Sequence, residues 1–277
     1  MQGAPQEFLD RWALIPLDAV ADTGAARIWK VQRTDGTQGA FKLYHRPDRG
    51  NEAPGTQLLS AWQDRGAVRI LDVAENAVLM EWLDGPTLGD IARSGQPEKA
   101  VQTLADTARL LHQGPLIDCT GLKPMAQVFA PLFECRFAER CAPPLARDIR
   151  HAIGLARALL DKQTVQIPLH GDLHHDNVIQ TQTGPRVIDA KGYLGDPAFE
   201  LANALRHPKG MKDLVRRTQQ IDRCLTLYAD AMAVPRQRLA KWAAAKCALS
   251  IFWRASGLVT EDAEADLLHL LLKIVDQ

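Results

Sequence analysis

Apolar and polar residues alternate along the first third of the chain, which is the pattern of half-buried β-strands. Residues 26–33 and 38–44 both alternate, and a Thr-Asp-Gly-Thr turn signal at 34–37 separates them. These two segments predict a β-hairpin. Residues 68–73 and 77–82 have the same character and predict a second pair of strands.

A helical pattern dominates the chain after about residue 84. Apolar residues recur there every three or four positions, as they do on the buried face of an amphipathic helix. One short helix is also expected in the first third, after Pro54, and residues 165–190 read as short strands and polar loops. The helices expected in the second part cover residues 101–111, 145–160, 211–232, 236–256 and 260–274.

The change of pattern near residue 84 predicts two lobes. We expect an α+β fold with a small β-rich N-terminal lobe, residues 1–84, and a larger, mainly helical C-terminal lobe, residues 85–277. Asp84-Gly85-Pro86 would form the short connection. A cleft between two lobes is a natural place for a ligand.

Composition narrows the class of protein. The 277 residues are 46% hydrophobic and 24% charged, which is ordinary for a globular protein and excludes disordered and coiled-coil classes. Lys and Arg number 33, equal to the 33 Asp and Glu, so no net positive charge draws the chain to nucleic acid or to an anionic membrane. We therefore expect neither nucleic acid nor a membrane as a partner.

The cysteines and the first residues indicate the compartment. The five cysteines form an odd set without a C-x-x-C pair, which fits neither a disulfide framework nor a zinc site. The first seven residues lack a basic and then apolar leader pattern, and no apolar run approaches the roughly 18 residues of a membrane span. We expect reduced, mostly buried thiols and a cytoplasmic protein.

The segment 169–178 is the most informative about chemistry. Its residues His170, Asp172 and Asn177 have the H-x-D-x-x-x-x-N arrangement of a kinase catalytic loop, and Asp189 follows after an apolar strand. Mg²⁺ prefers oxygen ligands, so Asn177 and Asp189 could supply the protein's share. Asp172 would then accept or orient the hydroxyl of an acceptor. The alternative is a polar turn whose aspartates cap helices and whose histidines are solvated.

Lys42 lies in the middle of a predicted strand, where alternation turns it to the same face as Ala40 and Tyr44. A lysine that faces a cleft can bind phosphate. Glu52 is expected at the start of the next helix, where it could pair with Lys42 and hold it against the α and β phosphates of a nucleotide. The alternative is a surface lysine and a carboxylate stabilised by the helix dipole.

Residues 78–85 form an apolar strand that runs into the connection between the lobes. The end of such a strand can offer backbone carbonyl and N–H groups to the edge of a purine. We place an adenine on the main chain of Glu81 and Leu83, with Met80 behind it and Trp82 nearby. The alternative is an ordinary edge strand that enters a loop.

Taken together, these residues resemble the aminoglycoside phosphotransferase family of the protein-kinase-like fold, and the resemblance covers nearly the whole chain. The streptomycin 6-kinase and hydroxyurea phosphotransferase branch is similar in three strings: His170-Gly-Asp-Leu-His-His-Asp-Asn177, Val187-Ile-Asp-Ala-Lys-Gly192 and Gly195-Asp-Pro-Ala-Phe-Glu200.

The resemblance implies a role for each matching residue. By it, Asp172 is the catalytic base, and Asn177 and Asp189 bind Mg²⁺. Lys42 holds the α and β phosphates, and Glu52 orients Lys42. The resemblance also implies ATP or GTP as the phosphoryl donor.

Two departures from the family pattern stand out. The branch has proline after the metal-binding aspartate, whereas this chain has Ala190, which changes the loop without removing a ligand. The nucleotide-covering loop, residues 19–26, has one glycine, so fewer backbone N–H groups would cover the phosphates. The neighbouring Lys191 could contact a phosphate or the substrate, and we interpret it as solvated. We expect Asp196 to accept hydrogen bonds from backbone N–H groups near the catalytic loop.

The acceptor is the open question. Aminoglycosides are polycations whose pocket should contain carboxylates, and four acidic residues do occur between 261 and 266. The alternative is that these residues offset the dipole of a helix that begins there. The leading hypothesis is an ATP-dependent kinase of a small-molecule acceptor such as streptomycin. The alternatives are a kinase of hydroxyurea or of another hydroxylated metabolite, and a nucleotide-binding pseudokinase.

Overall fold

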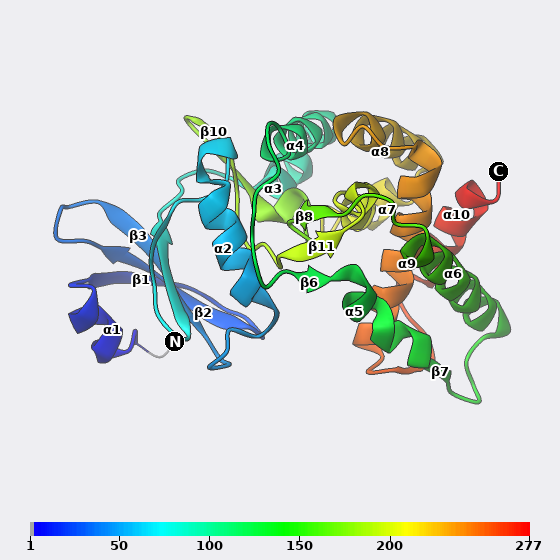
Figure 1. Ribbon diagram of the computed structural model, residues 1–277, viewed down its shortest axis with the longest axis horizontal. Coiled ribbons are helices and arrows are strands. Elements are labelled where there is room, and N and C mark those ends of the chain that lie inside the picture. The colour runs from blue at the N-terminus through cyan, green and yellow to red at the C-terminus, as the bar shows by residue number, and fades with distance from the viewer. Residues whose placement is uncertain (1–2) are drawn as a thin grey trace.

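The computed structural model describes residues 3–277, and Met1 and Gln2, the first residues of the predicted N-terminal lobe, lie outside the described residues. An antiparallel β-sheet occupies one end of the molecule, and the helices gather at the other (Figure 1). The chain therefore has the α+β class that its sequence predicts.

The sheet has the strand order β1-β2-β3-β5-β4. Its hairpin pairs β2 with β3, with Trp29 opposite Phe41, and confirms the predicted hairpin. The second predicted pair, β4 with β5, is also confirmed. Strand β1 was not expected, because apolar residues on it, such as Ile15 and Leu17, remain exposed and leave no clear buried face. The strands are β1 (Ile15–Asp22), β2 (Ala26–Gln32), β3 (Gln38–Tyr44), β4 (Ile70–Val73) and β5 (Ala77–Glu81).

One helix covers each face of this sheet. Helix α1 (Gln6–Arg11) places Phe8 against Phe41, which stacks on Trp29 with 5.2 Å between ring centroids. Helix α2 (Ala53–Ala61) carries Leu58, Leu59 and Trp62, which pack with Val78 and Met80 on the other face. Its first turn contains Pro54, as expected.

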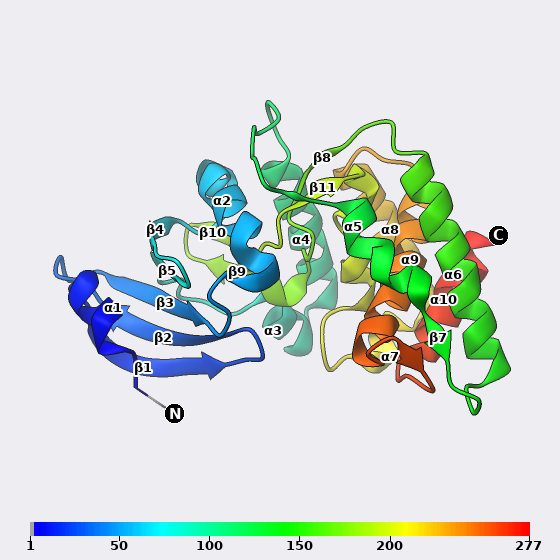
Figure 2. The ribbon, with the colours of Figure 1, turned by 60° about the horizontal axis from the view of Figure 1, so that its bottom comes forward.

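The helical part packs around α9, which is buried on almost every side from Leu239 to Ile251. Ala, Leu, Trp and Ile occupy most positions of this stretch, and its buried polar residues Lys246 and Ser250 hydrogen-bond each other. Helices α6, α8 and α10 contact it (Figure 2). The helices of this part are α3 (Leu88–Arg93), α4 (Pro97–Leu111), α5 (Met125–Phe129), α6 (Pro143–Asp161), α7 (Lys212–Val215), α8 (Thr218–Ala231), α9 (Arg236–Arg254) and α10 (Ala265–Val275).

The predicted helices are present, with two differences. The segment 211–232 forms two helices, because Arg217 has an extended conformation just before α8. The last helix begins at Ala265 and not at 260, because the Asp262 carboxylate accepts the N–H of Glu264 and pairs with Arg254 instead of entering a helical turn.

Residues 165–190 form short strands joined by polar loops, as the sequence indicated. Strands β9 and β10 form a hairpin, and β8 and β11 belong to a three-stranded sheet with β6. The loops between these strands contain the motif residues. The short strands are β6 (Lys123–Pro124), β7 (Arg136–Phe137), β8 (Ile167–Leu169), β9 (Val178–Thr181), β10 (Gly184–Val187), β11 (Tyr193–Gly195) and β12 (Leu258–Val259).

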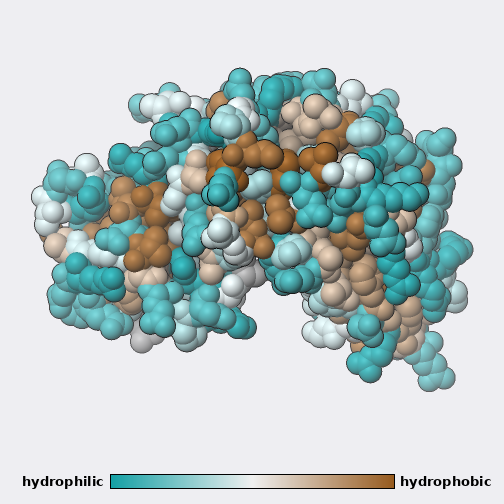
Figure 3. Space-filling model, in the orientation of Figure 1, coloured by the Kyte–Doolittle hydropathy of each residue, from teal (hydrophilic) through white to brown (hydrophobic). Residues whose placement is uncertain are grey.

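The surface is mixed in character. Hydrophilic residues cover most of the face in Figure 3, while hydrophobic residues form a band in its middle, where the sheet and the helical part meet. Of the five free thiols, those of Cys141, Cys224 and Cys247 are buried, and those of Cys119 and Cys135 are partly buried. Within residues 3–277, no helix combines the length and the apolar character that a membrane crossing requires.

Candidate active site

His170 ties the loop after β8 to the segment after β10. This histidine is fully buried, and its Nδ1 accepts the N–H of Asp172 at 3.2 Å. The proton is therefore on Nε2, which donates to the carbonyl oxygen of Ile188 at 2.8 Å. Burial lowers the pKa of His170, so its ring is neutral at neutral pH. Asp172 and Asp189 are thus held at the ends of two connected loops.

Glu200 binds the backbone of the same loop. Its buried carboxylate accepts the backbone N–H groups of His170, at 3.0 Å, and Gly171, at 3.3 Å, and contacts Nε2 of His112 at 2.9 Å. Burial raises the pKa of Glu200, but the hydrogen bond and charge of His112 outweigh burial, so the pKa lies below its usual value. The sequence contained Glu200 in a motif string but gave it no role.

The Asn177 side chain hydrogen-bonds the backbone of Asp172. Its Nδ2 donates to the Asp172 carbonyl oxygen at 3.0 Å, which leaves Oδ1 as its free oxygen. Asp189 binds Lys42 through Oδ1, and no described residue donates to its Oδ2. Asp189 also has φ of 61°, an uncommon conformation for a residue other than glycine and one that recurs at functional sites. Two free oxygens from Asn177 and Asp189 fit the ligand preference of Mg²⁺.

Lys42 is buried between two carboxylates from different parts of the chain. Its Nζ lies 2.6 Å from Oε2 of Glu52 and 2.8 Å from Oδ1 of Asp189. Burial lowers the pKa of Lys42, but the charges of Asp189, Tyr44 and Glu52 outweigh burial and raise the pKa above its ordinary value. Burial raises the pKa of Asp189, and Lys42 in turn holds it below its usual range. Lys42 is therefore a charged ammonium, on the same face of β3 as Tyr44, whose ring lies 5.0 Å away.

Lys191 is the second cation of this cluster, contrary to the prediction that it is solvated. Its Nζ lies 2.6 Å from Oε1 of Glu52, and its side chain is only 17% exposed. Glu52 therefore bridges Lys42 and Lys191. The sequence missed this contact because Glu52 and Lys191 are 139 positions apart and meet only in the fold.

Glycines allow α2 to lie directly against the segment after Asp189. A Cβ at Gly55 would stand 1.7 Å from the Ala190 carbonyl oxygen, and a Cβ at Gly192 would stand 2.7 Å from the Gly55 nitrogen. Only backbones without side chains can approach so closely. This contact brings Glu52, at the start of α2, next to the Asp189 loop. Ala190 in place of proline does not displace the Asp189 carboxylate from Lys42.

An apolar cavity of about 170 Å³ lies beside this cluster and contains the three residues predicted to contact a purine. No described residue pairs with the backbone N–H or C=O of Leu83, whereas the Glu81 N–H already donates to the Arg69 carbonyl oxygen. Leu83 is thus the free donor at the edge of the cavity, and Glu81 cannot donate there. The residues that line the cavity are Val20, Ile28, Ala40, Val68, Met80, Glu81, Trp82, Leu83, Ile179, Ile188 and Asp189.

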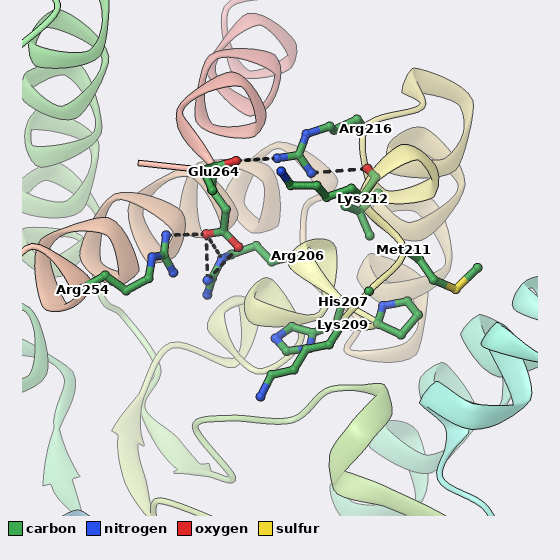
Figure 4. Close-up of a pocket in the computed structure, with 12 residues that line it drawn as sticks. Arg206, His207, Lys209, Met211, Lys212, Arg216, Arg254 and Glu264 are labelled. Atoms are coloured by element: carbon green, nitrogen blue, oxygen red, sulfur yellow. Dashed lines mark hydrogen bonds and ion pairs between the residues drawn. The ribbon is translucent and has the colours of Figure 1, made fainter. Parts of the chain in front are cut away.

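A second cavity, of about 320 Å³, lies in the helical part near α7 and the start of α10 (Figure 4). The Glu264 carboxylate stands between Arg206 and Arg254 and binds both. Nζ of Lys209 and of Lys212 contacts no carboxylate of the described residues. The charged residues that line this cavity are Arg206, Lys209, Lys212, Arg216, Arg254 and Glu264.

The acidic cluster at 261–266 is largely neutralised. Asp262 and Glu264 bind Arg254, Glu264 also binds Arg206, and Asp266 binds Arg216 at 2.6 Å. Asp266 is in the first turn of α10, where a carboxylate offsets the helix dipole. The helix-dipole interpretation accounts for Asp266, whereas Asp262 and Glu264 precede α10 and are neutralised by Arg254 and Arg206.

One smaller expectation needs correction. Asp196 accepts one backbone N–H, that of Ala198 in its own turn, and its other oxygen binds the side chains of Arg238 and Trp242 in α9. It therefore fastens that turn to the central helix. His174 meets Asp176 and His207, but its Nδ1 accepts the Asp176 N–H, and its ring stacks parallel to that of His207 at 3.7 Å. The ligand atoms of His174, Asp176 and His207 lie within 4.8 Å of one another.

Comparisons with known proteins agree with this geometry. A family model described as aminoglycoside/hydroxyurea antibiotic resistance kinase matches residues 11–257. The streptomycin 3''-kinase of Klebsiella pneumoniae is 32% identical over 253 residues, which are 88% of this chain and 90% of that protein. The hydroxyurea phosphotransferase of Kitasatospora aureofaciens is 29% identical over 275 residues, which are 96% of this chain and 75% of that protein.

A solved structure bears on the fold. The aminoglycoside phosphotransferase APH(3'')-Id of Streptomyces rimosus, in complex with ADP and streptomycin, has a TM-score of 0.58 to this chain at 17% identity. The match covers 86% of this chain and 92% of that chain. The fold is therefore that of aminoglycoside phosphotransferases, as the resemblance in sequence implied.

Proposed function

Because the chain belongs to the aminoglycoside/hydroxyurea antibiotic resistance kinase family and is thus a phosphotransferase with an alcohol group as acceptor, we propose that it transfers the γ-phosphoryl group of ATP to a hydroxyl of a small molecule. The observation that supports this most directly is the contact of Lys42 with Asp189, 2.8 Å apart across 147 positions of sequence. It joins the proposed phosphate-binding lysine to the proposed metal-binding aspartate in one site.

The proposed nucleotide site combines an apolar cavity with a fixed cation. The purine would enter the cavity beside Met80, donate to the Glu81 carbonyl oxygen and accept from the free N–H of Leu83. Lys42, oriented by Glu52, would hold the α and β phosphates. We propose that residues 1–84 carry the purine and phosphate contacts and that residues 85–277 carry the catalytic loop and the acceptor site.

The proposed metal ligands are Asn177 and Asp189, whose free oxygens suit Mg²⁺. When bound, Mg²⁺ supplies neutralising charge on the phosphates. The Asn177 amide is fixed by its bond to the Asp172 carbonyl oxygen, so its Oδ1 remains available.

Asp172 is the proposed base. Its Oδ1 accepts from Asn203, and no described residue donates to its Oδ2, so this oxygen is free to accept the proton of an acceptor hydroxyl. Two residues that line the cavity near α7 are connected to the Asp172 carboxylate through other side chains. Arg206 donates to Asn203, which binds Oδ1. His207 stacks on His174, whose Nε2 lies 4.0 Å from Oδ2. We infer that the acceptor occupies this cavity.

The first candidate acceptor is streptomycin, because relatives at 28–32% identity carry that substrate in their names. One observation favours a second candidate, a less cationic hydroxylated molecule such as hydroxyurea. The cavity offers five cationic side chains and the single carboxylate of Glu264, which two arginines already neutralise. Such a lining repels a polycation.

The test is ATP consumption with Mg²⁺ against a panel of streptomycin, other aminoglycosides, hydroxyurea and neutral sugars, with mass spectrometry of each acceptor. We expect a phosphorylated product with at least one member, and turnover on streptomycin alone would establish the narrow function. Binding of ATP without any phosphorylated product would favour a pseudokinase. Absence of ATP binding would contradict the kinase function itself.

A further inference from the structure

We infer that Asn203 is a positioning residue that holds the Asp172 carboxylate in one orientation and leaves its Oδ2 for the acceptor. This inference rests on the proposed role of Asp172. Asn203 lies in the short 3-10 turn Ala202–Arg206, is 4% exposed, and donates from Nδ2 to Oδ1 of Asp172 at 2.7 Å.

The hydrogen bonds of Asn203 can run in one direction only. Its Oδ1 accepts from Nη1 of Arg206 at 2.7 Å, and a guanidinium has donors and no acceptor. An amide turned the other way would set its NH₂ against Arg206 and its oxygen against the Asp172 carboxylate. The Nδ2 of Asn203 must therefore face Asp172.

Arg206 is itself held on its far side. Its Nη1 donates to Oγ of Ser250 at 2.7 Å, and its guanidinium binds both oxygens of Glu264, at 2.9 and 3.1 Å. Ser250 belongs to the central helix α9, and Glu264 precedes α10. A continuous chain of hydrogen bonds thus connects the packed helices to one oxygen of Asp172, and the Arg206 charge polarises the amide that donates to it.

The remaining hydrogen bonds of Asp172 fix its backbone and not its carboxylate. Its N–H donates to His170, and its carbonyl oxygen accepts from Asn177. Asn203 is the described residue that hydrogen-bonds the side chain. Without it the carboxylate could rotate about its side-chain bonds, and phosphoryl transfer is sensitive to misplacement of about 1 Å.

The experiment compares Asn203→Ala with Asn203→Asp, using the acceptor that the panel identifies. An aspartate has the size of asparagine and still accepts from Arg206, but it cannot donate to Asp172 and sets a second carboxylate beside it. We expect both variants to lower kcat by about 100-fold or more, with the KM for ATP within about two-fold of the wild-type value. If Asn203 only supported Arg206, the kcat of Asn203→Asp would be normal, and that result would overturn the inference.

A double-mutant cycle adds a readout that loss of folding does not imitate. In an Asp172→Asn protein, Asn203→Asp should lower kcat no further, because the carboxylate that Asn203 orients is already gone. Additive effects would overturn the inference. A wild-type protein without phosphoryl transfer to any acceptor would overturn the proposed function, and the role of Asn203 with it, whereas an active Asn203→Asp protein beside an active wild type overturns the role of Asn203 alone.

Discussion

Lys42 shows how single side chains define the site. Its side chain is 5% exposed and its ammonium contacts Glu52 and Asp189, so two carboxylates compensate the burial of one charge. Lys191 shares Glu52, so four charged groups alternate in sign across the interface between α2 and the Asp189 loop. Lys42 and Glu52 would each be an uncompensated buried charge without these neighbours.

Substitution of Lys42 should damage nucleotide binding first. Lys42→Met removes the cation proposed to hold the α and β phosphates, so we expect the KM for ATP to rise by about 10-fold or more. Steady-state kinetics over a range of ATP concentrations measures this. Lys99→Met, at an exposed position of α4, is the matched control and should leave the KM unchanged. Equal KM values for wild type and Lys42→Met would remove Lys42 from the phosphate site.

Substitution of Asp189 should uncouple ATP binding from Mg²⁺. Asp189→Ala removes one of the two proposed metal ligands, so calorimetry should detect no gain in ATP affinity on addition of Mg²⁺, in contrast to the wild type. Asp64→Ala changes an exposed carboxylate far along the sequence and should behave as the wild type does. A Mg²⁺ effect that survives in Asp189→Ala would exclude this residue as a ligand.

At the scale of elements, α2 is the part that joins the sheet to the Asp189 loop. Its backbone at Gly55 touches the Ala190 carbonyl, and its first residues carry the partner of Lys42. Gly85 has a similar function at the connection, where a Cβ would stand 2.0 Å from the Gln180 carbonyl oxygen. The two close approaches fix the sheet against the loops of the helical part.

A methyl group at Gly55 should therefore disturb both stability and activity. Gly55→Ala forces α2 away from Ala190, and overpacking of this kind costs about 1–3 kcal/mol of unfolding free energy. Gly154→Ala, in the middle of α6 with no atom near the new Cβ, should instead stabilise the protein by about 1 kcal/mol through helix propensity. Urea unfolding of the two variants measures both changes. A Gly55→Ala protein as stable and active as the wild type would contradict the close approach.

The sequence predicted the elements well where one face of the element is buried. Alternation identified the hairpin of β2 and β3, and three- and four-residue spacing identified α4, α6 and α9. Strand β1 was not predicted because its apolar residues are exposed. The break at Arg217 was not predicted because apolar periodicity continues across it. Periodicity reports burial and not backbone conformation.

The residues of the site were likewise predictable only where a short sequence pattern contains them. Short spacings within one loop identified Asp172 and Asn177, and the structure brings Asp189 and Lys42 into one cluster as expected. The contacts of Asn203 and Lys191 could not be predicted, because partners 31 and 139 positions away are set by the packing of α9 and α2. No local pattern carries that information.

At the scale of the whole molecule, buried histidines gather in the loop that contains Asp172 and at His207 beside it. Burial is the largest cause that lowers the pKa of each, to about 3 for His175, whose two nitrogens have no hydrogen-bond partner among the described residues. The unfolded chain binds protons at these residues below about pH 6.5, whereas the folded chain does not. Unfolding free energy must therefore fall as pH falls from 6.5 toward 3. The four histidines are His170, His174, His175 and His207.

We expect the protein to lose stability well before its carboxylates protonate. His175, whose pKa is about 3, alone contributes about 1 kcal/mol of unfolding free energy that is lost between about pH 7.5 and 5.5, and the lowered pKa values of the other three histidines act in the same direction. Urea unfolding at the two pH values measures the loss. His175→Leu should reduce the loss by about 1 kcal/mol, and His151→Leu, at an exposed position, should not change it. Equal stability at both pH values would show that these histidines are not buried neutral.

The central claim is that Asp172 is the base of a phosphotransferase, and its most direct test is Asp172→Ala in parallel assays of turnover and nucleotide binding. We predict that kcat falls by about 1,000-fold or more, while calorimetry gives an ATP affinity within about three-fold of the wild-type value, because Asp172 contacts neither the purine cavity nor Lys42. Near-normal turnover of the folded Asp172→Ala protein would contradict the account.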